Sequence, residues 1–441
     1  MIFDLIKPIT YRLKKVFELL SKGNTWKEIP KSDFLLLCHD VNRGGEVDGK
    51  AFSPLIDTLQ IDIQEQGFSC AQFAYPESKI VGSEAWGRPF HATSAWALSC
   101  LVSCAEIRFF SKIVETLTFG KISLTKKFGK EAFYKKLLDL TKPQAIIGVE
   151  PYPMLCKVCR EKKIPVVEIF HGFGYTDKVF TYLWKEEPTP VGVMALDETS
   201  AKTFSGDYFR NMGVWCEYVG HPYYKRFLTN KMETLPKWNV VSGKPTNISL
   251  NKKKILYCMN WGYCGDHGIY SEFEGILQNG VCPGELLEVI RSIGQGYHFL
   301  FRLHPVHLRN KNKYKYIFDF LERLEKENPN IEWRYASQAA LPALYNDVDC
   351  QISMRSETCY DAAFFGVKTL LLCPTLKLGG KIEKHFYDLF KKGFVEYWTG
   401  TTSDLNNWIK TVKKIAPSVM DIAVLEDNFQ KSIKRMLGLK S

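Results

Sequence analysis

The chain has 441 residues, of which 45% are hydrophobic and 24% are charged, and its formal net charge is +11. This balance is typical of a folded globular protein and excludes an intrinsically disordered chain. The length exceeds that of one ordinary hydrophobic core, so it predicts two large domains. The sequence has no uninterrupted apolar run of about eighteen residues, so no transmembrane helix is predicted.

The positive charge is distributed over several lysine-rich patches. No basic run is interleaved with regularly spaced aromatic residues, so nucleic acid is not expected as a partner. The patches have two interpretations that the sequence leaves open. They are either solvated surface, or they attract an anionic membrane surface and an anionic substrate. The patches are residues 12–15, 252–254, 309–313 and 431–435.

Residues 1–30 form a separate basic segment at the N-terminus. Its first twenty residues have the pattern of a basic amphipathic helix, although Pro8 limits where the helix begins. The segment lacks a small-residue cleavage site, so we do not interpret it as a signal peptide. Such a helix either lies on the inner face of the cytoplasmic membrane, making the protein peripheral, or packs against the rest of the chain.

The thirteen cysteines are scattered among apolar runs, which predicts buried free thiols and a cytoplasmic, reducing compartment. Cys156 and Cys159 have the spacing of a redox or zinc pair. No second pair or histidine follows at ligand distance, so no metal is predicted there. Asp347-Val-Asp349 has the spelling of a metal-binding Asp-x-Asp motif, but it opens a buried strand at the opposite end from the expected ligand edge. We therefore predict no metal site.

Continuous apolar strands alternate with helical segments along most of the chain. This alternation predicts an α/β protein with parallel sheets covered on both faces. Residues 31–221 form the predicted N-terminal domain, with a mostly helical stretch at 80–135, and residues 251–441 form the C-terminal domain. The turn-rich, polar residues 222–250 are the predicted linker. Expected strands are 34–38, 145–149, 166–170, 191–196 and 217–219, then 253–260, 297–303, 331–335, 349–353 and 368–373.

Two segments of the C-terminal domain place polar residues at the ends of buried strands. The first, residues 299–305, ends in Arg302, His304 and Pro305, and the second, residues 352–363, has a hydroxyl-rich turn before a helix. Ligands of open α/β sheets bind at the carboxyl edge, so this pair predicts a site for a nucleotide phosphate. The alternative is structural, with His304 capping a strand and Thr358 capping a helix. The residues predicted to bind the nucleotide are Arg302, His304, Ser353, Ser356 and Thr358.

Candidate catalytic groups lie at other strand ends. Glu150 follows the strand at 145–149 and can act as a general base toward an acceptor hydroxyl, with His171 on the neighbouring strand end. A structural hydrogen-bonded pair is the competing interpretation. His39, Asp40 and Arg43 extend the same rim. In the C-terminal domain, Asp266 lies at the tip of a glycine-rich loop after the first strand, where a solvent-exposed turn residue is one interpretation.

The C-terminal signature resembles GT-B glycosyltransferases of bacterial surface polysaccharides that use CMP-activated sugars, namely Kdo transferases and sialyltransferases. It is also similar to CDP-glycerol polymer transferases. In those families a strand-end His-Pro and a later Ser/Thr-rich turn bind the nucleotide. The resemblance implies a GT-B-like fold in which two Rossmann-type, doubly wound domains face each other across a cleft. The resemblance in architecture extends over most of the chain, but the matching residues are confined to short, separate segments.

The resemblance implies a metal-independent glycosyltransferase that moves a sugar, best matched by Kdo from CMP-Kdo, onto a lipopolysaccharide or capsule glycan. No cofactor is expected, and the partners are a nucleotide sugar and a glycan or lipid-linked glycan acceptor. Asp266 would be the nucleophile if stereochemistry is retained, and Glu150 suffices as base if it is inverted. Three alternatives stay open. They are a CDP-polyol phosphotransferase, a sugar-nucleotide epimerase (whose usual Ser-Gly-Gly turn is missing here), and a non-catalytic glycan-binding protein.

Overall fold

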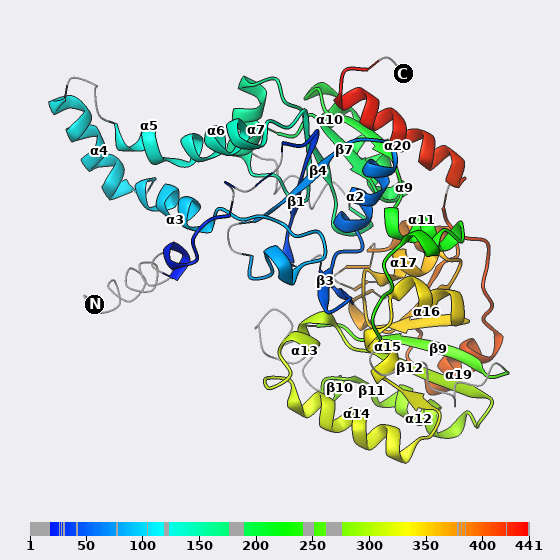
Figure 1. Cartoon of the computed structure of the whole chain (residues 1–441). Helices are drawn as coiled ribbons and strands as arrows, with labels where there is room; N and C mark the ends of the chain where they lie inside the picture. The colour runs from blue at the N-terminus through cyan, green and yellow to red at the C-terminus, as the bar shows by residue number, and fades with distance from the viewer. Residues whose placement is uncertain are drawn as a thin grey trace. The chain divides into compact units, whose positions relative to one another are not determined.

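The computed structural model describes residues 18–439, except 26, 28, 30, 41–42, 76–77, 104, 119–122, 176–188, 241–250, 262–275, 377–378, 381, 384 and 420. The chain forms two compact units (Figure 1). Unit 1 comprises the described parts of Met1–His171, Tyr175–Lys225 and Ala423–Ser441, and unit 2 comprises those of Gly172–Gly174 and Arg226–Ile422. Among the described helices, none combines the length and the apolar character needed to cross a membrane.

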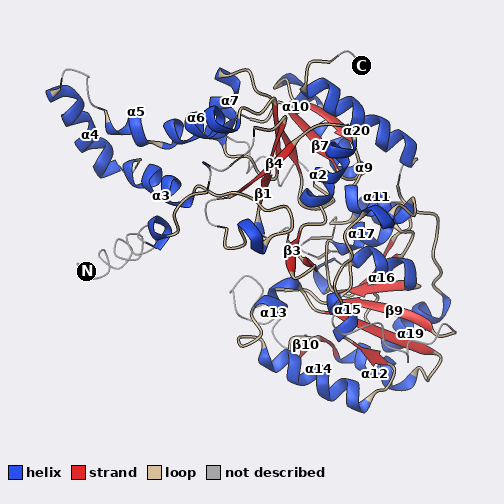
Figure 2. Ribbon diagram, in the orientation of Figure 1, coloured by secondary structure: helices blue, strands red, loops and turns tan. Residues whose placement is uncertain are grey.

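Unit 1 is built on a six-stranded parallel sheet in the order β4-β1-β5-β6-β7-β8. Every residue of β1, β5, β6 and β7 is buried, as expected for strands covered on both faces. Figure 2 shows helices on both sides of these strands. The strands are β1 (Phe34–Cys38), β4 (Cys70–Ala74), β5 (Ala145–Gly148), β6 (Val166–Ile169), β7 (Gly192–Ala195) and β8 (Trp215–Tyr218), with a β2–β3 hairpin (Gly45–Val47, Lys50–Phe52).

The stretch between β4 and β5 is helical, as the sequence predicts for residues 80–135. Strand β4 itself was not predicted, because the polar Gln72 interrupts its apolar run. The helices of unit 1 are α2 (Ile56–Glu65), α3 (Thr93–Val102), α4 (Ala105–Leu117), α5 (Leu124–Phe128), α6 (Lys130–Thr141), α7 (Pro153–Glu161), α9 (Glu198–Phe204), α10 (Asp207–Asn211) and α20 (Ile422–Met436), with a 3-10 turn η3 (Gly82–Glu84).

Helix α20 returns to unit 1, although the sequence analysis assigned the whole of residues 251–441 to the second domain. Asn428 donates a hydrogen bond to the carbonyl of Tyr218 at the end of β8, at 2.9 Å. Lys225 lies over the ring of Phe429, 5.2 Å from its centroid. The amphipathic pattern of α20 predicts a buried face, but only the tertiary structure shows which sheet that face covers. Helix α11 (Pro222–Leu228) spans the division between the units, where the sequence predicted a linker.

Unit 2 contains a second six-stranded parallel sheet, in the order β13-β12-β9-β14-β15-β16. Two doubly wound parallel sheets confirm the predicted α/β fold class. Strand β16 was not predicted, because that region was interpreted as mostly helical. The strands are β9 (Lys253–Cys258), β12 (Tyr297–Arg302), β13 (Ile331–Glu332), β14 (Cys350–Ser353), β15 (Lys368–Leu371) and β16 (Val395–Tyr397), with a β10–β11 pair (Leu277–Gln278, Cys282–Pro283).

Strand β13 is shorter than the predicted 331–335 for a local reason. The carboxyl group of Glu332 accepts hydrogen bonds from the backbone N–H groups of Tyr335 and Ala336, and so begins a helix. The helices of unit 2 are α12 (Gly284–Ser292), α13 (Pro305–Arg309), α14 (Lys315–Glu327), α15 (Arg334–Gln338), α16 (Leu341–Asp347), α17 (Thr358–Phe364), α18 (Tyr387–Lys391) and α19 (Thr402–Thr411), with 3-10 turns η4 (Met232–Thr234) and η6 (Pro374–Leu376).

Unit 2 buries histidines that lack hydrogen-bond partners. Both ring nitrogens of His298 and of His307 are unpartnered among the described residues. Burial is the main cause that lowers the pKa of each ring to about 4, and Lys252 and Lys254 lower the pKa of His298 further. A histidine that is neutral in the folded state and has an ordinary pKa when unfolded favours unfolding in acid.

We predict that the unfolding free energy decreases as the pH falls from about 6.5 toward 4, because in this window the unfolded chain takes up protons that the folded chain does not. Between pH 7 and pH 5, the His298→Phe variant should lose less unfolding free energy than the wild type, by an amount on the order of 1 kcal/mol. Urea denaturation of both proteins at the two pH values measures this difference. An unchanged pH dependence in the variant would contradict the neutral buried state of His298.

Candidate active site

The carboxyl edge of the sheet in unit 1 holds Glu150, two residues after the end of β5. Its backbone adopts φ +51°, in the left-handed region that non-glycine residues rarely occupy. The side chain is about half exposed. Residues held in this conformation occur preferentially where the surrounding structure imposes it, often at functional sites. Glu150 is therefore both a polar group at the ligand edge and a point of backbone strain.

Two buried side chains hold the backbone of Glu150 in place. The carboxyl group of Glu168, from the adjacent strand β6, accepts a hydrogen bond from the N–H of Glu150 at 2.9 Å. On the other side, the hydroxyl of Tyr75 contacts the carbonyl oxygens of Val149 and Glu150. Burial raises the pKa of Glu168 well above its ordinary value, which favours the uncharged form of this carboxyl group. Glu168 therefore positions the backbone of Glu150 from within the sheet.

His171 lies at the neighbouring strand end, one residue beyond Phe170, and the structure brings it to Glu150 as the sequence predicted. Its Nδ1 atom is 3.8 Å from a carboxylate oxygen of Glu150. The hydroxyl of Tyr175 lies 2.8 Å from Nδ1 and 3.0 Å from Nε2 of the same ring. Burial lowers the pKa of His171 more than the nearby Glu150 raises it, which favours a neutral ring at pH 7. Tyr175 is a member of this cluster that the sequence analysis did not identify.

The remaining predicted rim residues have different roles. Arg43 is buried and forms an ion pair with Asp57 at 2.9 Å, while its other terminal nitrogen donates to Gln72 at 2.7 Å. Arg43 is therefore a core residue that joins α2 to β4. It does not face a ligand at the sheet edge, because its guanidinium group is buried and paired with the carboxylate of Asp57. Asp40 accepts hydrogen bonds from the backbone N–H groups of Lys79 and Ile80, which orders a loop. The ring of His39 lies against Tyr75.

In unit 2, the ends of β9 and β14 are connected by side-chain hydrogen bonds. Ser353 is fully buried, and its hydroxyl lies 2.8 Å from the carbonyl oxygen of Cys258 and 2.9 Å from the amide oxygen of Asn260. The same amide oxygen accepts from the N–H of Arg355 at 3.2 Å. Ser353 therefore supports the loop geometry at this edge, and Asn260 is a residue that the sequence analysis did not single out.

The hydroxyl-rich turn after β14 is arranged by local bonds. Ser356 accepts the N–H of Thr358 at 3.3 Å, so Ser356, rather than Thr358, satisfies the first turn of α17. Thr358 instead accepts from the side-chain amide of Gln351 at 3.2 Å. Next to them, the carboxyl group of Glu357 lies 2.9 Å from Nε2 of His385. Of the three predicted hydroxyls, Ser353 is fully buried, whereas Ser356 and Thr358 are partly exposed.

Arg302 is turned toward protein carbonyls. Its Nη1 atom donates to the carbonyl oxygens of Ala336 and Ala339, at 2.6 and 2.7 Å. These bonds satisfy groups at the end of α15, where helical carbonyls have no partner within the helix. Arg302 therefore holds α15 against the sheet, and its nearby positive charge is one of the causes that lower the pKa of His304.

His304 follows β12 and begins α13. Its Nδ1 atom accepts the backbone N–H of Val306 at 3.2 Å, which requires this nitrogen to be unprotonated. Burial and the cations Arg309 and Arg302 lower its pKa to about 4, so the neutral ring carries its proton on Nε2. The ring stacks on Trp261, with centroids 6.3 Å apart. His304 is thus arranged as a neutral hydrogen-bond donor through Nε2.

A cavity of about 400 Å³ opens at the carboxyl ends of β15 and β16 in unit 2. The sequence analysis did not predict it, because its wall is assembled from four separated segments. An aromatic ring, aliphatic side chains and two polar side chains in such a cavity suit a flat polar ligand. The residues that line it are Ile276, Gln278, Pro283, Gly284, Glu285, Leu372, Pro374, Trp398 and Gly400.

The last three candidates from the sequence are Asp266, the Asp-x-Asp sequence and the cysteine pair. Asp266 lies outside the described residues. Asp347 and Asp349 bind Lys254, the first through its ammonium group at 3.0 Å and the second through its backbone N–H at 2.7 Å. Cys156 and Cys159 are buried free thiols on α7, and burial raises the pKa of each thiol, for Cys156 to about 12.

No protein-family model matches the sequence, and no curated protein matches it. Solved structures do match. A protein assigned as a UDP-N-acetylglucosamine 2-epimerase from Listeria monocytogenes has a TM-score of 0.51 and 8% identity, over 92% of this chain and 96% of that one. The UDP-GlcNAc 2-epimerase from Neisseria meningitidis, bound to UDP-GlcNAc, has a TM-score of 0.49 and 13% identity, over 91% and 99%. The glycosyltransferase SnogD from Streptomyces nogalater has 0.44 and 12%, over 92% and 95%.

The chain therefore has a GT-B-like fold made of two Rossmann-type domains. Identities at this level establish the fold only, and a fold by itself does not determine an activity. The choice between activities depends on the residues at the two sheet edges.

We predict that Glu150→Gly leaves the stability unchanged or raises it by up to about 1 kcal/mol, because glycine adopts positive φ without strain. The matched control is Lys157→Gly inside α7, which should cost about 1 kcal/mol. Urea denaturation of both variants measures the difference. A loss of stability in Glu150→Gly equal to that of the control would contradict the strain at this position.

Proposed function

We propose that this protein is a nucleotide-sugar-dependent glycosyltransferase that uses a cytidine-linked acidic sugar. The observation that carries the proposal is Glu150, held at φ +51° at the sheet edge with His171 3.8 Å away. A carboxylate in a fixed, half-exposed position beside a neutral imidazole is suited to removing a proton from a sugar hydroxyl. The GT-B-like fold supports a nucleotide-sugar substrate.

In the proposed reaction, Glu150 takes the proton of an acceptor hydroxyl as its oxygen bonds to the anomeric carbon of the donor. The bond between that carbon and the donor phosphate breaks, and the nucleotide leaves with the electron pair. His171, held by Tyr175, orients the Glu150 carboxylate. This route inverts the anomeric centre and requires no metal. A retaining route through Asp266 is the alternative, and it would form a covalent intermediate on that carboxylate.

Unit 2 is proposed to bind the nucleotide. The Nε2–H of His304 donates to a phosphate oxygen, and Ser356 contributes a hydroxyl. The cavity lined by Trp398 and Gln278 is proposed to accept the base, because it offers an apolar wall and an amide for hydrogen bonding. In this scheme Arg302, Ser353 and Thr358 support the site through the protein bonds described above.

The proposed donor and acceptor follow from the resemblance of the sequence to transferases that use CMP-activated sugars. The donor is proposed to be CMP-Kdo, and the acceptor a lipopolysaccharide or capsule glycan at the inner face of the cytoplasmic membrane. The positive charge of the chain suits both an acidic donor and an anionic surface.

We predict that Glu150→Gln lowers the rate of sugar transfer by roughly 10²- to 10⁴-fold, as expected when a general base is removed. The affinity for CMP should stay unchanged, because Glu150 belongs to unit 1. Transfer is measured with radiolabelled CMP-Kdo, and Glu161→Gln on α7 is the matched control. An unchanged rate in Glu150→Gln would exclude it as the base. If the wild type converts UDP-GlcNAc to its 2-epimer, the proposed transferase activity is wrong and the protein is an epimerase.

We predict that His304→Ala weakens CMP binding by about tenfold or more, the usual effect of losing one hydrogen bond to a charged group. His304→Asn is the matched variant, because its side chain keeps a cap for α13 but cannot reach as the imidazole does. It should bind CMP as weakly as His304→Ala while retaining wild-type thermal stability. Calorimetry with CMP measures the affinity.

A thermal-shift comparison of CMP, CDP, UDP and GDP tests the identity of the base. CMP and CDP are expected to stabilise the protein, and stabilisation by UDP alone would overturn the cytidine assignment. Unchanged CMP affinity in both His304 variants would reject His304 as a phosphate ligand.

A further inference from the structure

Three consecutive helices of unit 1 expose large apolar side chains. Ile113 and Leu117 of α4 are 41% and 74% exposed, and Leu98 of α3 and Phe128 of α5 are each 38% exposed. Leu117 is the most exposed large apolar side chain among the described residues. Helix α5 contacts both α3 and α4, so the four side chains belong to one region, which we name the α3–α5 surface. In Figure 1 these helices (cyan) lead away from the sheet of unit 1.

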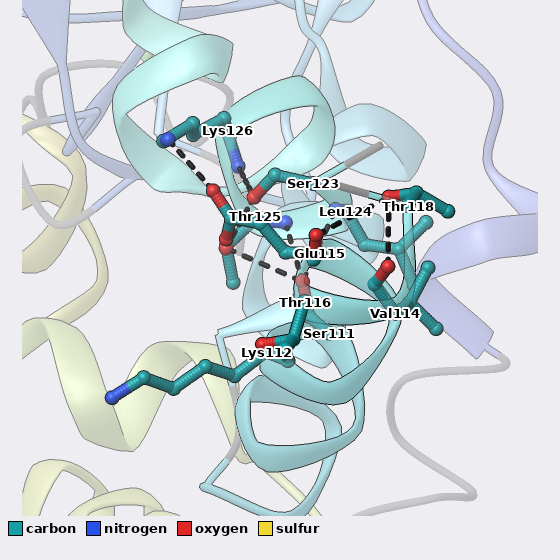
Figure 3. A network of polar contacts seen from close by, with 10 residues as sticks. All are labelled: Ser111, Lys112, Val114, Glu115, Thr116, Thr118, Ser123, Leu124, Thr125 and Lys126. Carbon is teal, nitrogen blue, oxygen red and sulfur yellow. Dashed lines mark hydrogen bonds and ion pairs between the residues drawn. The ribbon is translucent and has the colours of Figure 1, made fainter. Parts of the chain in front are cut away.

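Among the described side chains of α4, from Ser111 to Leu117, a hydroxyl is buried while two large apolar groups are exposed. The hydroxyl of Ser111 is buried and accepts the backbone N–H groups of Leu124 and Thr125 at 3.1 and 3.3 Å (Figure 3). Ile113 and Leu117 are four residues apart and so lie on the same side of the helix. Large apolar side chains that gather on an exposed side of a helix indicate an interaction surface.

The outward stripe lies among basic side chains. Between residues 105 and 128 the sequence has five lysines or arginines and two glutamates. Exposed Lys112 is adjacent to Ile113, and exposed Lys127 lies over the ring of its neighbour Phe128, 5.4 Å from the centroid. The carboxylate of Glu115 is already bonded to Lys126 at 2.7 Å, as Figure 3 shows. The α3–α5 surface therefore combines protruding apolar groups with an excess of positive charge.

We propose that the α3–α5 surface docks onto an anionic lipid bilayer. Ile113 and Leu117 enter the boundary between headgroups and acyl chains, while the lysines bind anionic headgroups. A second copy of the chain is disfavoured as the occupant, because two such surfaces would bring their excess lysines together. Binding to a membrane surface becomes stronger with the apolar area that is buried and with the attraction to anionic lipids, and this surface offers both.

This inference goes beyond the proposed activity, since it requires neither a nucleotide nor an acceptor. It assigns membrane attachment to helices in the middle of the chain, whereas the sequence suggested the first twenty residues. A lipid-linked acceptor would be reached by an enzyme attached in this way, but vesicle binding stands or falls independently of catalysis.

The test is co-sedimentation of the full-length protein with phosphatidylcholine vesicles that contain or lack phosphatidylglycerol. We expect binding to the anionic vesicles, weakened by added salt. The double variant Ile113→Ser, Leu117→Ser should lower the partition coefficient by about tenfold or more, since two exposed apolar side chains are removed. Lys112→Gln with Lys127→Gln should lower it on anionic vesicles alone. Transfer to a water-soluble acceptor should be unchanged in all variants.

The matched control is Val424→Ser on α20, an exposed apolar side chain outside the α3–α5 surface, which should bind vesicles as the wild type does. Circular dichroism establishes that each variant is folded. Wild-type binding to neither vesicle, equal binding to both, or undiminished binding of the double serine variant would each overturn the proposal. Analytical ultracentrifugation measures the oligomeric state of the wild type and of the double serine variant. A wild-type dimer that dissociates in this variant would show that the surface binds a second copy of the chain instead.

Discussion

The central strands of both parallel sheets are buried on both faces, and this constraint determines where the chemistry of the chain can lie. A parallel strand buried in this way leaves no room for a charged side chain along its length, except one that is neutralised or paired. Glu168 in β6 fits this rule, because burial raises the pKa of its carboxyl group well above the ordinary value and so favours the neutral form. Polar groups that must meet a ligand are therefore confined to the strand ends.

At the edge of unit 1, the strained backbone of Glu150 depends on its neighbours. The carboxyl group of Glu168 and the hydroxyl of Tyr75 bind the two sides of the same peptide segment. Glu168 belongs to β6 and Tyr75 directly follows β4, so the conformation of Glu150 is a property of the whole edge. The proposed base thus keeps one position, with His171 beside it, before any substrate binds.

The edge of unit 2 shows that residues selected by one motif can have quite different roles. Arg302 and Ser353 use their hydrogen-bonding groups on the protein, whereas His304 is left with an Nε2–H because Val306 takes its other nitrogen. Spacing alone treats such residues alike, because each follows a buried strand. Their division into supporting and ligand-facing groups depends on partners distant in the sequence, such as Ala336 and Cys258.

The sequence by itself determined the fold class, the order of most strands and helices, and the pairing of Glu150 with His171. These follow from local hydrophobic period and from the rule that parallel strands end at one edge. Only the tertiary structure decided that Arg43 is a core residue, that α20 covers unit 1, that Tyr175 joins the cluster, and that Ile113 and Leu117 of α4 are exposed. The first two depend on partners far along the chain, and the other two depend on how a loop and a helix are oriented, so no local hydrophobic period encodes them.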